Sequence, residues 1–335
     1  MTIVGHDTQT AAFLSELSGG RMHHAWLLAG PEGIGKATLA LAFARRALSD
    51  AAGPKVEGQG VGGPVDHPVG RLVDNFSHPD LVLLERLPKD PKQTRDIGRA
   101  DWPNDLERAR SISVDQVRGL NHVFALKPSY SQTRVVVVDA IDDLERAAAN
   151  ALLKSLEEPP QGTMFLLVSH APGRLLPTIR SRCRLMRFVA LDDVAMRRVL
   201  RDKLPKADDA ELTALIAAGE GSPGKALGYA GLDIAGIDAA LAKLAETGDK
   251  TTVIRHELAR SLALKSAHGR YQAFLGRVPG FVAGEARLKS GDALSGAIKV
   301  WEEARSLSDT ALRQSLDPAM TVFSLAGMVA GLARP

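Results

Sequence analysis

GPEGIGKAT, the stretch at residues 30–38, decides how this chain folds. Gly30, Gly35 and Lys36 match the phosphate-binding pattern of Gly, four residues, Gly and Lys. The apolar run AWLLA at 25–29 precedes this loop, and Lys36–Leu48 has the pattern of a buried helix. In such a strand–loop–helix unit, the backbone N–H groups of the loop bind phosphate at the positive end of the helix. The stretch therefore predicts a nucleotide-binding α/β domain.

Two alanines stand where an ATP-hydrolysing site needs functional side chains. Ala37 occupies the position of the hydroxyl that coordinates Mg²⁺. The run Val135–Val138 is followed by Asp139, which suits a Mg²⁺-bound water, but Ala140 replaces the glutamate that activates the attacking water in most hydrolysing proteins of this kind. Loss of a positioned base costs about 10²–10⁴ in rate. We expect weak ATP binding, little or no ATPase in the isolated chain, and no polymerase activity.

Asp142 and Asp143 lie close to this site in the sequence, but we expect them to cap the next helix rather than to act as the base. The alternative remains that the loop is an inherited fold element that no longer binds nucleotide. No resident metal is predicted. The residues expected to bind nucleotide are Gly30, Gly33, Gly35, Lys36, Thr38 and Asp139.

Short continuous apolar runs alternate with helical patterns through the first 190 residues. Such runs are typical of a parallel sheet that helices cover on both faces. A second strong helix is predicted at Asp143–Glu158, where apolar residues recur every four positions before Pro159-Pro160. The predicted strands are Ala25–Ala29, Leu81–Glu85, Val135–Val138, Met164–Val168 and Met186–Ala190.

The rest of the chain is helical in pattern, with a break expected near Pro279-Gly280. Residues 51–76 and 87–110 are rich in Gly and Pro or in charges, so they are predicted to be insertions or mobile loops. The expected domains are a P-loop α/β domain at 1–190, a small helical domain at 191–232 and a C-terminal helical domain at 233–335.

The composition excludes several classes of protein. A net charge of +3 over 335 residues is too small for a chain that binds nucleic acid by electrostatics alone. Cys183 is the single cysteine, which excludes an internal disulfide and a multi-cysteine metal site. The start MTIVGHDTQT lacks the parts of a signal peptide, and the weakly polar stretch Met320–Ala333 is too short to span a bilayer. We expect a cytoplasmic protein without membrane contact.

Arginines crowd the segment TIRSRCR at 178–184. Arg180, Arg182, Arg184 and Arg187 lie between or within predicted strands at the expected edge of the domain. The planar guanidinium suits bidentate phosphate contacts, so one of these arginines could reach the site of a neighbouring subunit. A solvated basic turn is the alternative interpretation.

Four blocks of the sequence resemble the bacterial clamp-loader subunits of the AAA+ class, and among them the delta-prime family of DNA polymerase III. They are HHAWLLAGPEGIGKATLA (23–40), ANALLKSLEEPP (149–160), TMFLLVSHAPGRLLPTIRSRCR (163–184) and GSPGKAL (221–227). The resemblance covers the first 230 residues, and the remainder agrees in length and helical character.

The resemblance implies a RecA-like α/β domain, a helical lid and a helical collar, within a hetero-pentameric ring of delta, delta-prime and the gamma/tau ATPases. It implies a subunit with weak or absent ATPase, in a ring that loads the sliding clamp on primer-template DNA. The arginine of the family's Ser-Arg-Cys motif acts in trans on the ATP site of the adjacent subunit, and Arg182 holds that position. Such an arginine is worth about 10³–10⁵ in rate.

The chain departs from the family pattern in two places. Residues 49–80 contain no cysteine, so His67 and His78 cannot form the zinc module of many relatives, and no zinc is predicted. Gly224-Lys225 replaces the lid arginine that senses nucleotide in active relatives. One alternative is a self-sufficient gamma/tau-like AAA+ ATPase, against which the two alanines argue. Another is a small-molecule P-loop kinase, which would leave the arginine segment unexplained.

Overall fold

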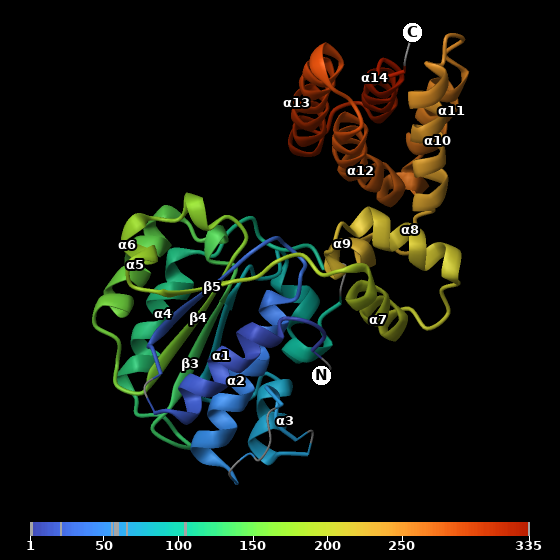
Figure 1. Cartoon of the computed structure of the whole chain (residues 1–335). Helices are drawn as coiled ribbons and strands as arrows, with labels where there is room; N and C mark the ends of the chain where they lie inside the picture. The colour runs from blue at the N-terminus through green and yellow to red at the C-terminus, as the bar shows by residue number, and fades with distance from the viewer. Residues whose placement is uncertain are drawn as a thin grey trace. The chain divides into compact units, whose positions relative to one another are not determined.

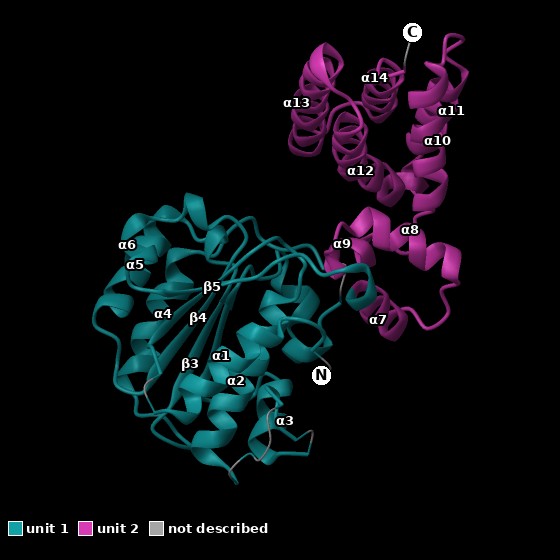
Figure 2. Cartoon of the chain, in the orientation of Figure 1, with its two compact units in different colours: residues 1–195 teal, residues 196–335 magenta. Residues whose placement is uncertain are grey.

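The computed structural model describes residues 3–20, 22–54, 56, 60–64, 66–103 and 106–333. The chain forms two compact units, Met1–Ala195 and Met196–Pro335 (Figure 2). Each unit is described by itself below. The predicted boundary between a lid and a collar domain near residue 232 stays a prediction.

The first unit is built on one five-stranded parallel sheet with the strand order β2-β3-β4-β1-β5. The predicted α/β fold with a parallel sheet is therefore confirmed. Two strands begin and end where predicted, and β3 and β4 are one residue longer at each end. The strands are β1 Ala25–Ala29, β2 Leu81–Glu85, β3 Arg134–Asp139, β4 Thr163–Ser169 and β5 Arg184–Arg187.

The fifth strand was predicted at the wrong residues: it starts at Arg184, two positions before the predicted start at Met186. β5 lies at the sheet edge, pairing only with β1 in the described sheet, and Met186 is its single buried residue. An edge strand with one buried side chain carries no apolar run, which is why the sequence pattern pointed to the more apolar residues that follow.

Helices cover both faces of this sheet (Figure 1). Side chains alternate along the strands, so Trp26 and Leu28 of β1 face the α1–α2–α3 side while Leu27 faces the α4–α5–α6 side. The helix α3 lies within the segment 51–76, which is thus not all loop. The helices are α1 Asp7–Ser18, α2 Lys36–Ala52, α3 Pro68–Asp74, α4 Val114–Ala125, α5 Arg146–Glu157 and α6 Pro177–Arg180, with short 3-10 turns at Pro91–Thr94, Arg99–Asp101, Ile141–Asp143 and Pro172–Arg174.

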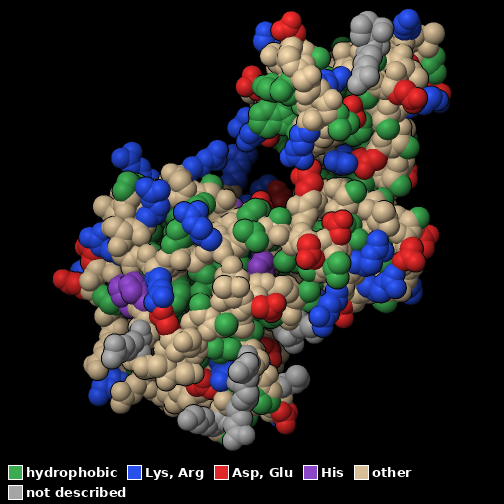
Figure 3. All heavy atoms as spheres, in the orientation of Figure 1, with side chains coloured by type: hydrophobic (Ala, Val, Ile, Leu, Met, Phe, Trp, Pro, Cys, Tyr) green, Lys and Arg blue, Asp and Glu red, His purple; other side chains and the backbone are tan. Residues whose placement is uncertain are grey.

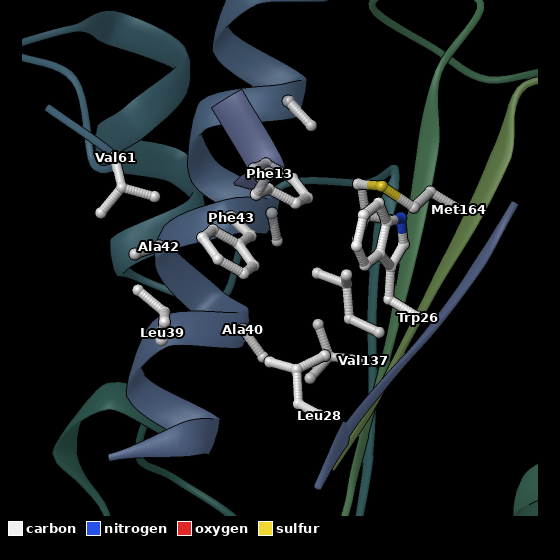
Figure 4. Close-up of a cluster of buried hydrophobic side chains, with 14 of the residues drawn as sticks. Phe13, Trp26, Leu28, Leu39, Ala40, Ala42, Phe43, Val61, Val137 and Met164 are labelled. Atoms are coloured by element: carbon white, nitrogen blue, oxygen red, sulfur yellow. The ribbon is translucent and has the colours of Figure 1, made fainter. Parts of the chain in front are cut away.

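An aromatic cluster fixes α2, the helix that follows the P-loop, against the sheet (Figure 4). Phe13 of α1 stacks on Phe43 of α2 with ring centroids 3.8 Å apart, and the edge of Trp26 packs against Phe13. All three side chains are at most 2% exposed. Because the N-terminus of α2 cannot shift without disturbing this cluster, the packing holds the P-loop in place.

The helix α5 carries the predicted apolar stripe but starts later than predicted. Ala148, Leu152 and Leu156 are buried, which confirms the stripe. The backbone of residues 143–145 instead pairs with Ile112: the Ile112 N–H donates to the Asp143 carbonyl at 2.8 Å, and the Glu145 N–H donates to the Ile112 carbonyl at 3.1 Å. This long-range pairing holds Leu144 and Glu145 extended after the 3-10 turn that ends at Asp143, and it delays the start of the helix.

The segment between β2 and α4, residues 86–110, forms an anchored arm rather than a free loop. Backbone bonds close its base, from Lys89 to the Glu107 carbonyl at 2.9 Å and from Ala109 to the Leu87 carbonyl at 2.7 Å. We call this segment the β2–α4 arm; its residues 104 and 105 lie outside the described residues.

The side chain of Glu85 holds the β2–α4 arm in place. Glu85 is buried and accepts hydrogen bonds from the guanidinium groups of Arg99 and Arg108. Trp102 packs against both guanidiniums, with centroid distances of 4.7 and 5.7 Å. Charge-assisted bonds to a buried carboxylate make this an ordered anchor.

The second unit contains only helices among its described residues. Helix α12 runs through Pro279, so the predicted break near Pro279-Gly280 is wrong. An interior proline costs about 3 kcal/mol, but burial of Val278 and Val282 against the neighbouring helices offsets that cost. The helices are α7 Asp193–Lys203, which begins at the end of the first unit, α8 Asp209–Gly219, α9 Pro223–Gly228, α10 Ile234–Thr247, α11 Val253–Leu262, α12 His268–Arg287, α13 Gly291–Gln314 and α14 Pro318–Ala330, with a 3-10 turn at Lys265–Ala267.

Arg277 ties two parts of the second unit together. Its Nε donates to Asp238 of α10 at 2.6 Å, and its Nη1 lies 3.9 Å from Glu220, in the turn between α8 and α9. Glu220 also pairs with Lys225 of α9 at 2.9 Å. Among the described residues of the chain, no helix is long and apolar enough to cross a membrane.

Candidate functional site

The P-loop has the backbone conformation that its glycines predict. Gly33 and Gly35 have φ values of +74° and +97°, a region that costs other residues strain. Gly30 lies so close to the chain after β5 that a Cβ would stand 2.5 Å from the Phe188 carbonyl oxygen. The Gly30 N–H donates to the Ser169 carbonyl at the end of β4. These contacts place the loop at the carboxyl edge of the sheet, where nucleotides bind in α/β proteins.

Lys36, at the start of α2, is bound by its own loop. Its side chain is buried, and its ammonium donates to the Gly30 carbonyl at 2.7 Å and to the Pro31 carbonyl. Burial lowers the pKa of Lys36 to about 8, although Asp139, Glu32 and Asp142 act in the opposite direction. Thr38 lies in the first turn of α2 and is half-buried. In this structure the Lys36 ammonium is therefore bound to carbonyl groups of the P-loop itself.

At the end of β3, Asp139 lies close enough to Lys36 for their charges to interact. Burial raises the pKa of Asp139, and the nearby His170 opposes that shift. A raised pKa favours the neutral, protonated carboxyl, which accepts a hydrogen bond from a metal-bound water less well than a carboxylate does. Ala140 is buried, and its side chain has no polar atom that could act as a base. Of the residues predicted to bind nucleotide, the structure thus brings together the P-loop, Lys36 and Asp139.

The prediction that Asp142 and Asp143 cap the next helix is wrong. Asp142 accepts hydrogen bonds from the Ser169 hydroxyl at 3.0 Å and from the backbone N–H groups of His170 and Ala171. Asp143 pairs with Arg86 at 3.1 Å. Both carboxylates are engaged by neighbouring segments, and the expectation that neither serves as a general base stays a prediction.

His170 is a site residue that the sequence reasoning missed. It follows β4 directly, and its charge influences the pKa values of both Asp139 and Asp143. Its ring atom Nδ1 is buried without a hydrogen-bond partner among the described residues. A polar residue immediately after a buried central strand was the available signal, since such residues meet at the carboxyl edge of a parallel sheet.

The two histidines considered for a zinc module have local structural roles. His67 caps α3 through the Gly70 N–H and contacts the Pro54 carbonyl at 2.9 Å. His78 accepts from the Asp80 N–H at 3.0 Å. Within the described ranges, no three metal-binding side chains gather into a site.

Arg182 lies on the connection between α6 and β5, at the sheet edge, with one third of its side chain exposed. Its Nη1 donates to the Thr178 carbonyl at 2.8 Å and contacts the Ser181 hydroxyl at 3.4 Å. Its Nη2 forms an ion pair with Glu157 Oε1 at 2.6 Å. The guanidinium is thus held on one side and open on the other.

The other arginines of this segment differ from Arg182. Arg184 pairs with Glu16 and packs on Trp26, so it stabilises the attachment of α1. Arg180 and Arg187 are exposed and form no ion pair within the described part of the chain. Figure 3 shows lysine and arginine side chains gathered over the part of the first unit where α5 and α6 lie. This edge therefore offers positive charge to a partner.

The comparisons with known proteins concern mainly the first unit. The family described as "DNA polymerase III, delta subunit" matches residues 5–192. The chain is 36% identical over 216 residues to DNA polymerase III subunit delta′ of Pseudomonas aeruginosa, covering 63% of this chain and 57% of the relative. It is 34% identical to delta′ of Haemophilus influenzae over 193 residues, 58% of this chain and 51% of the relative.

Subunits of the gamma/tau type are also similar. The chain is 32% identical over 225 residues to the gamma/tau subunit of Mycobacterium tuberculosis, covering 66% of this chain and 34% of the relative. A gamma-subunit-related protein of Thermotoga maritima has a TM-score of 0.44 at 16% identity, covering 96% of this chain and 99% of that one. The chain thus spans about half the length of its delta′ relatives in these alignments. Since the family match covers more than half of the sequence, the chain belongs to the DNA polymerase III delta-subunit family, in its delta-prime branch.

Proposed function

We propose that this chain is the delta-prime-like subunit of a DNA polymerase III clamp loader, and that its Arg182 acts on the ATP site of an adjacent ATPase subunit. The observation that carries the proposal is the contrast between the two sites. The chain's own site lacks the hydroxyl at Ala37 and the base at Ala140, while Arg182 is held by three contacts, is one third exposed and lies at the sheet edge. A subunit with these features can activate hydrolysis without performing it.

The proposed partners follow from the relatives. A gamma/tau subunit would supply the ATP site that receives Arg182, and a delta subunit would complete the hetero-pentameric ring. The sliding clamp and primer-template DNA would be contacted through the complex. The small net charge of the chain supports this indirect contact, because it does not favour autonomous DNA binding.

Nucleotide binding in the chain's own site is proposed to be weak. The loop glycines, the N-terminus of α2 and Lys36 fit a phosphate group, and they are the residues that would hold it. Lys36 must first give up its bonds to the Gly30 and Pro31 carbonyls. No side-chain oxygen is present at Ala37 for a Mg²⁺ ion that accompanies ATP.

A second candidate is a gamma/tau-like ATPase, which the intact P-loop geometry and the gamma/tau relatives favour. Steady-state ATPase of the isolated chain distinguishes the two. Turnover at a rate typical of an ATPase, abolished by Lys36→Met, would support the second candidate and contradict the first.

The main test is the DNA- and clamp-stimulated ATPase of the reconstituted loader with Arg182→Ala. We expect hydrolysis at the one site that receives Arg182 to fall by about 10³-fold or more, so that the kcat of the loader loses at least the contribution of that site, with the ring intact by gel filtration. Arg180→Ala is the matched control, because Arg180 lies in the same segment, is exposed and forms no ion pair among the described residues. An unchanged rate for Arg182→Ala would refute the proposed role in trans.

A further inference from the structure

Glu157 is the last residue of α5, and its carboxylate lies in an electrostatically unfavourable place. Helix C-termini carry partial negative charge, and Glu158 adds a second carboxylate beside Glu157. Lys154 is the one basic residue in that last turn. A cation from elsewhere in the fold stabilises a carboxylate at this position, and Arg182 supplies one.

The ion pair between Glu157 and Arg182 joins segments that are distant in sequence. Glu157 Oε1 lies 2.6 Å from Nη2 of Arg182, while Nη1 of the same guanidinium is fixed to the Thr178 carbonyl and the Ser181 hydroxyl. Three contacts therefore determine the direction of the guanidinium. Nε has no acceptor within the described part of the chain, and one third of the side chain stays exposed.

Helix α5 is a rigid platform for this contact. Leu152 and Leu156 of α5 are at most 1% exposed in the core beneath the sheet. A carboxylate on the final turn of such a helix has a defined position, so it restricts a flexible arginine far better than solvent would. Displacing a reacting group by about 1 Å from its productive position can lower the reaction rate by about 10²-fold.

We propose that Glu157 is a positioning residue for Arg182: its carboxylate holds the guanidinium in the direction required to reach the phosphates in the neighbouring subunit. The proposal rests on the function proposed above. Glu157 does not itself contact nucleotide, so it acts only through Arg182.

The test uses the reconstituted loader with Glu157→Gln, and Glu158→Gln as the matched control. Both substitutions remove one negative charge from the same helix end, but only Glu157 pairs with Arg182. A half-exposed ion pair shifts the equilibrium between the paired and unpaired orientations of a side chain by up to about fivefold. We expect Glu157→Gln to lower kcat by about 2- to 5-fold with KM for ATP unchanged, and Glu158→Gln to behave as wild type.

A double-mutant cycle adds a readout that a merely structural role would not give. In an Arg182→Ala background, Glu157→Gln should cause no further loss, because the residue through which it acts is gone. If Glu157→Gln lowers the rate equally in both backgrounds, or raises it, or matches Glu158→Gln in the wild-type background, the positioning role is wrong. If Arg182→Ala itself leaves the rate unchanged, the proposed function fails first, and the two failures are thus distinguished.

Discussion

Leu152→Ala tests whether the first unit is held together as its packing indicates. Leu152 is fully buried on α5, in the cluster that α4, α5 and α6 form with one face of the sheet. The substitution removes about three buried methylene equivalents, worth about 0.8 kcal/mol each by transfer. The cavity left behind adds to this, and Leu→Ala substitutions in cores cost about 2–5 kcal/mol in total. We expect the free energy of unfolding of the first unit to fall by about 3 kcal/mol.

Urea denaturation followed by tryptophan fluorescence measures this change. Trp26 and Trp102 lie in the first unit and Trp301 in the second, so a Trp301→Phe background makes the signal report the first unit. Lys154→Ala is the control, because Lys154 is exposed on the same helix and its loss should cost less than about 0.5 kcal/mol. A fall of less than about 1 kcal/mol for Leu152→Ala, with the same denaturant slope, would refute the assigned packing of α5.

Two further predictions concern the edge of the sheet. The pKa of Lys36 in the folded chain is about 8, against an ordinary 10.5, so the folded state binds fewer protons than the unfolded state between these pH values; the free energy of unfolding should therefore rise with pH in this range, and nucleotide affinity should fall above pH 8. Urea titrations measure the free energy of unfolding and calorimetry measures the affinity over pH 7–10.5, and Lys36→Met should remove both pH dependences. Glu85→Gln should loosen the β2–α4 arm, because Arg99 and Arg108 lose their buried carboxylate, and it should lower the free energy of unfolding by about 1–3 kcal/mol. Faster hydrogen exchange in residues 86–103 and 106–110 would show the loosening, and unchanged exchange would contradict the anchoring role.

Features that depend on local pattern could be predicted from the sequence. The P-loop and the strands β1 and β2 were predicted to the residue, because buried parallel strands are continuous apolar runs bounded by turns. The apolar stripe of α5 followed from helical periodicity in the same way. What these features share is that the signal and the structure occupy the same few residues.

Features that depend on distant residues could not be predicted. Asp142 reads locally as a helix cap, but the fold brings β4 beside it and gives it three donors from residues 169–171. Glu157 has no partner nearby in the sequence, and only the fold places Arg182, on the connection between α6 and β5, against it. Pro279 reads as a helix end, because the burial that sustains α12 around it involves other helices. In each case tertiary contacts override the local preference.

The contacts of Arg277 have a mechanical consequence. Asp238 on α10, Glu220 beside α9 and Arg277 on α12 are joined through a single guanidinium that is only 12% exposed. Rotation of the turn after α8 against α10 and α12 would therefore break the pair between Arg277 and Glu220, while the shorter and more buried pair with Asp238 links α12 to α10. Within this unit, the single Arg277 guanidinium thus couples the position of the α8–α9 turn to the position of α10 and α12, so a displacement of one of these elements is resisted by the other two.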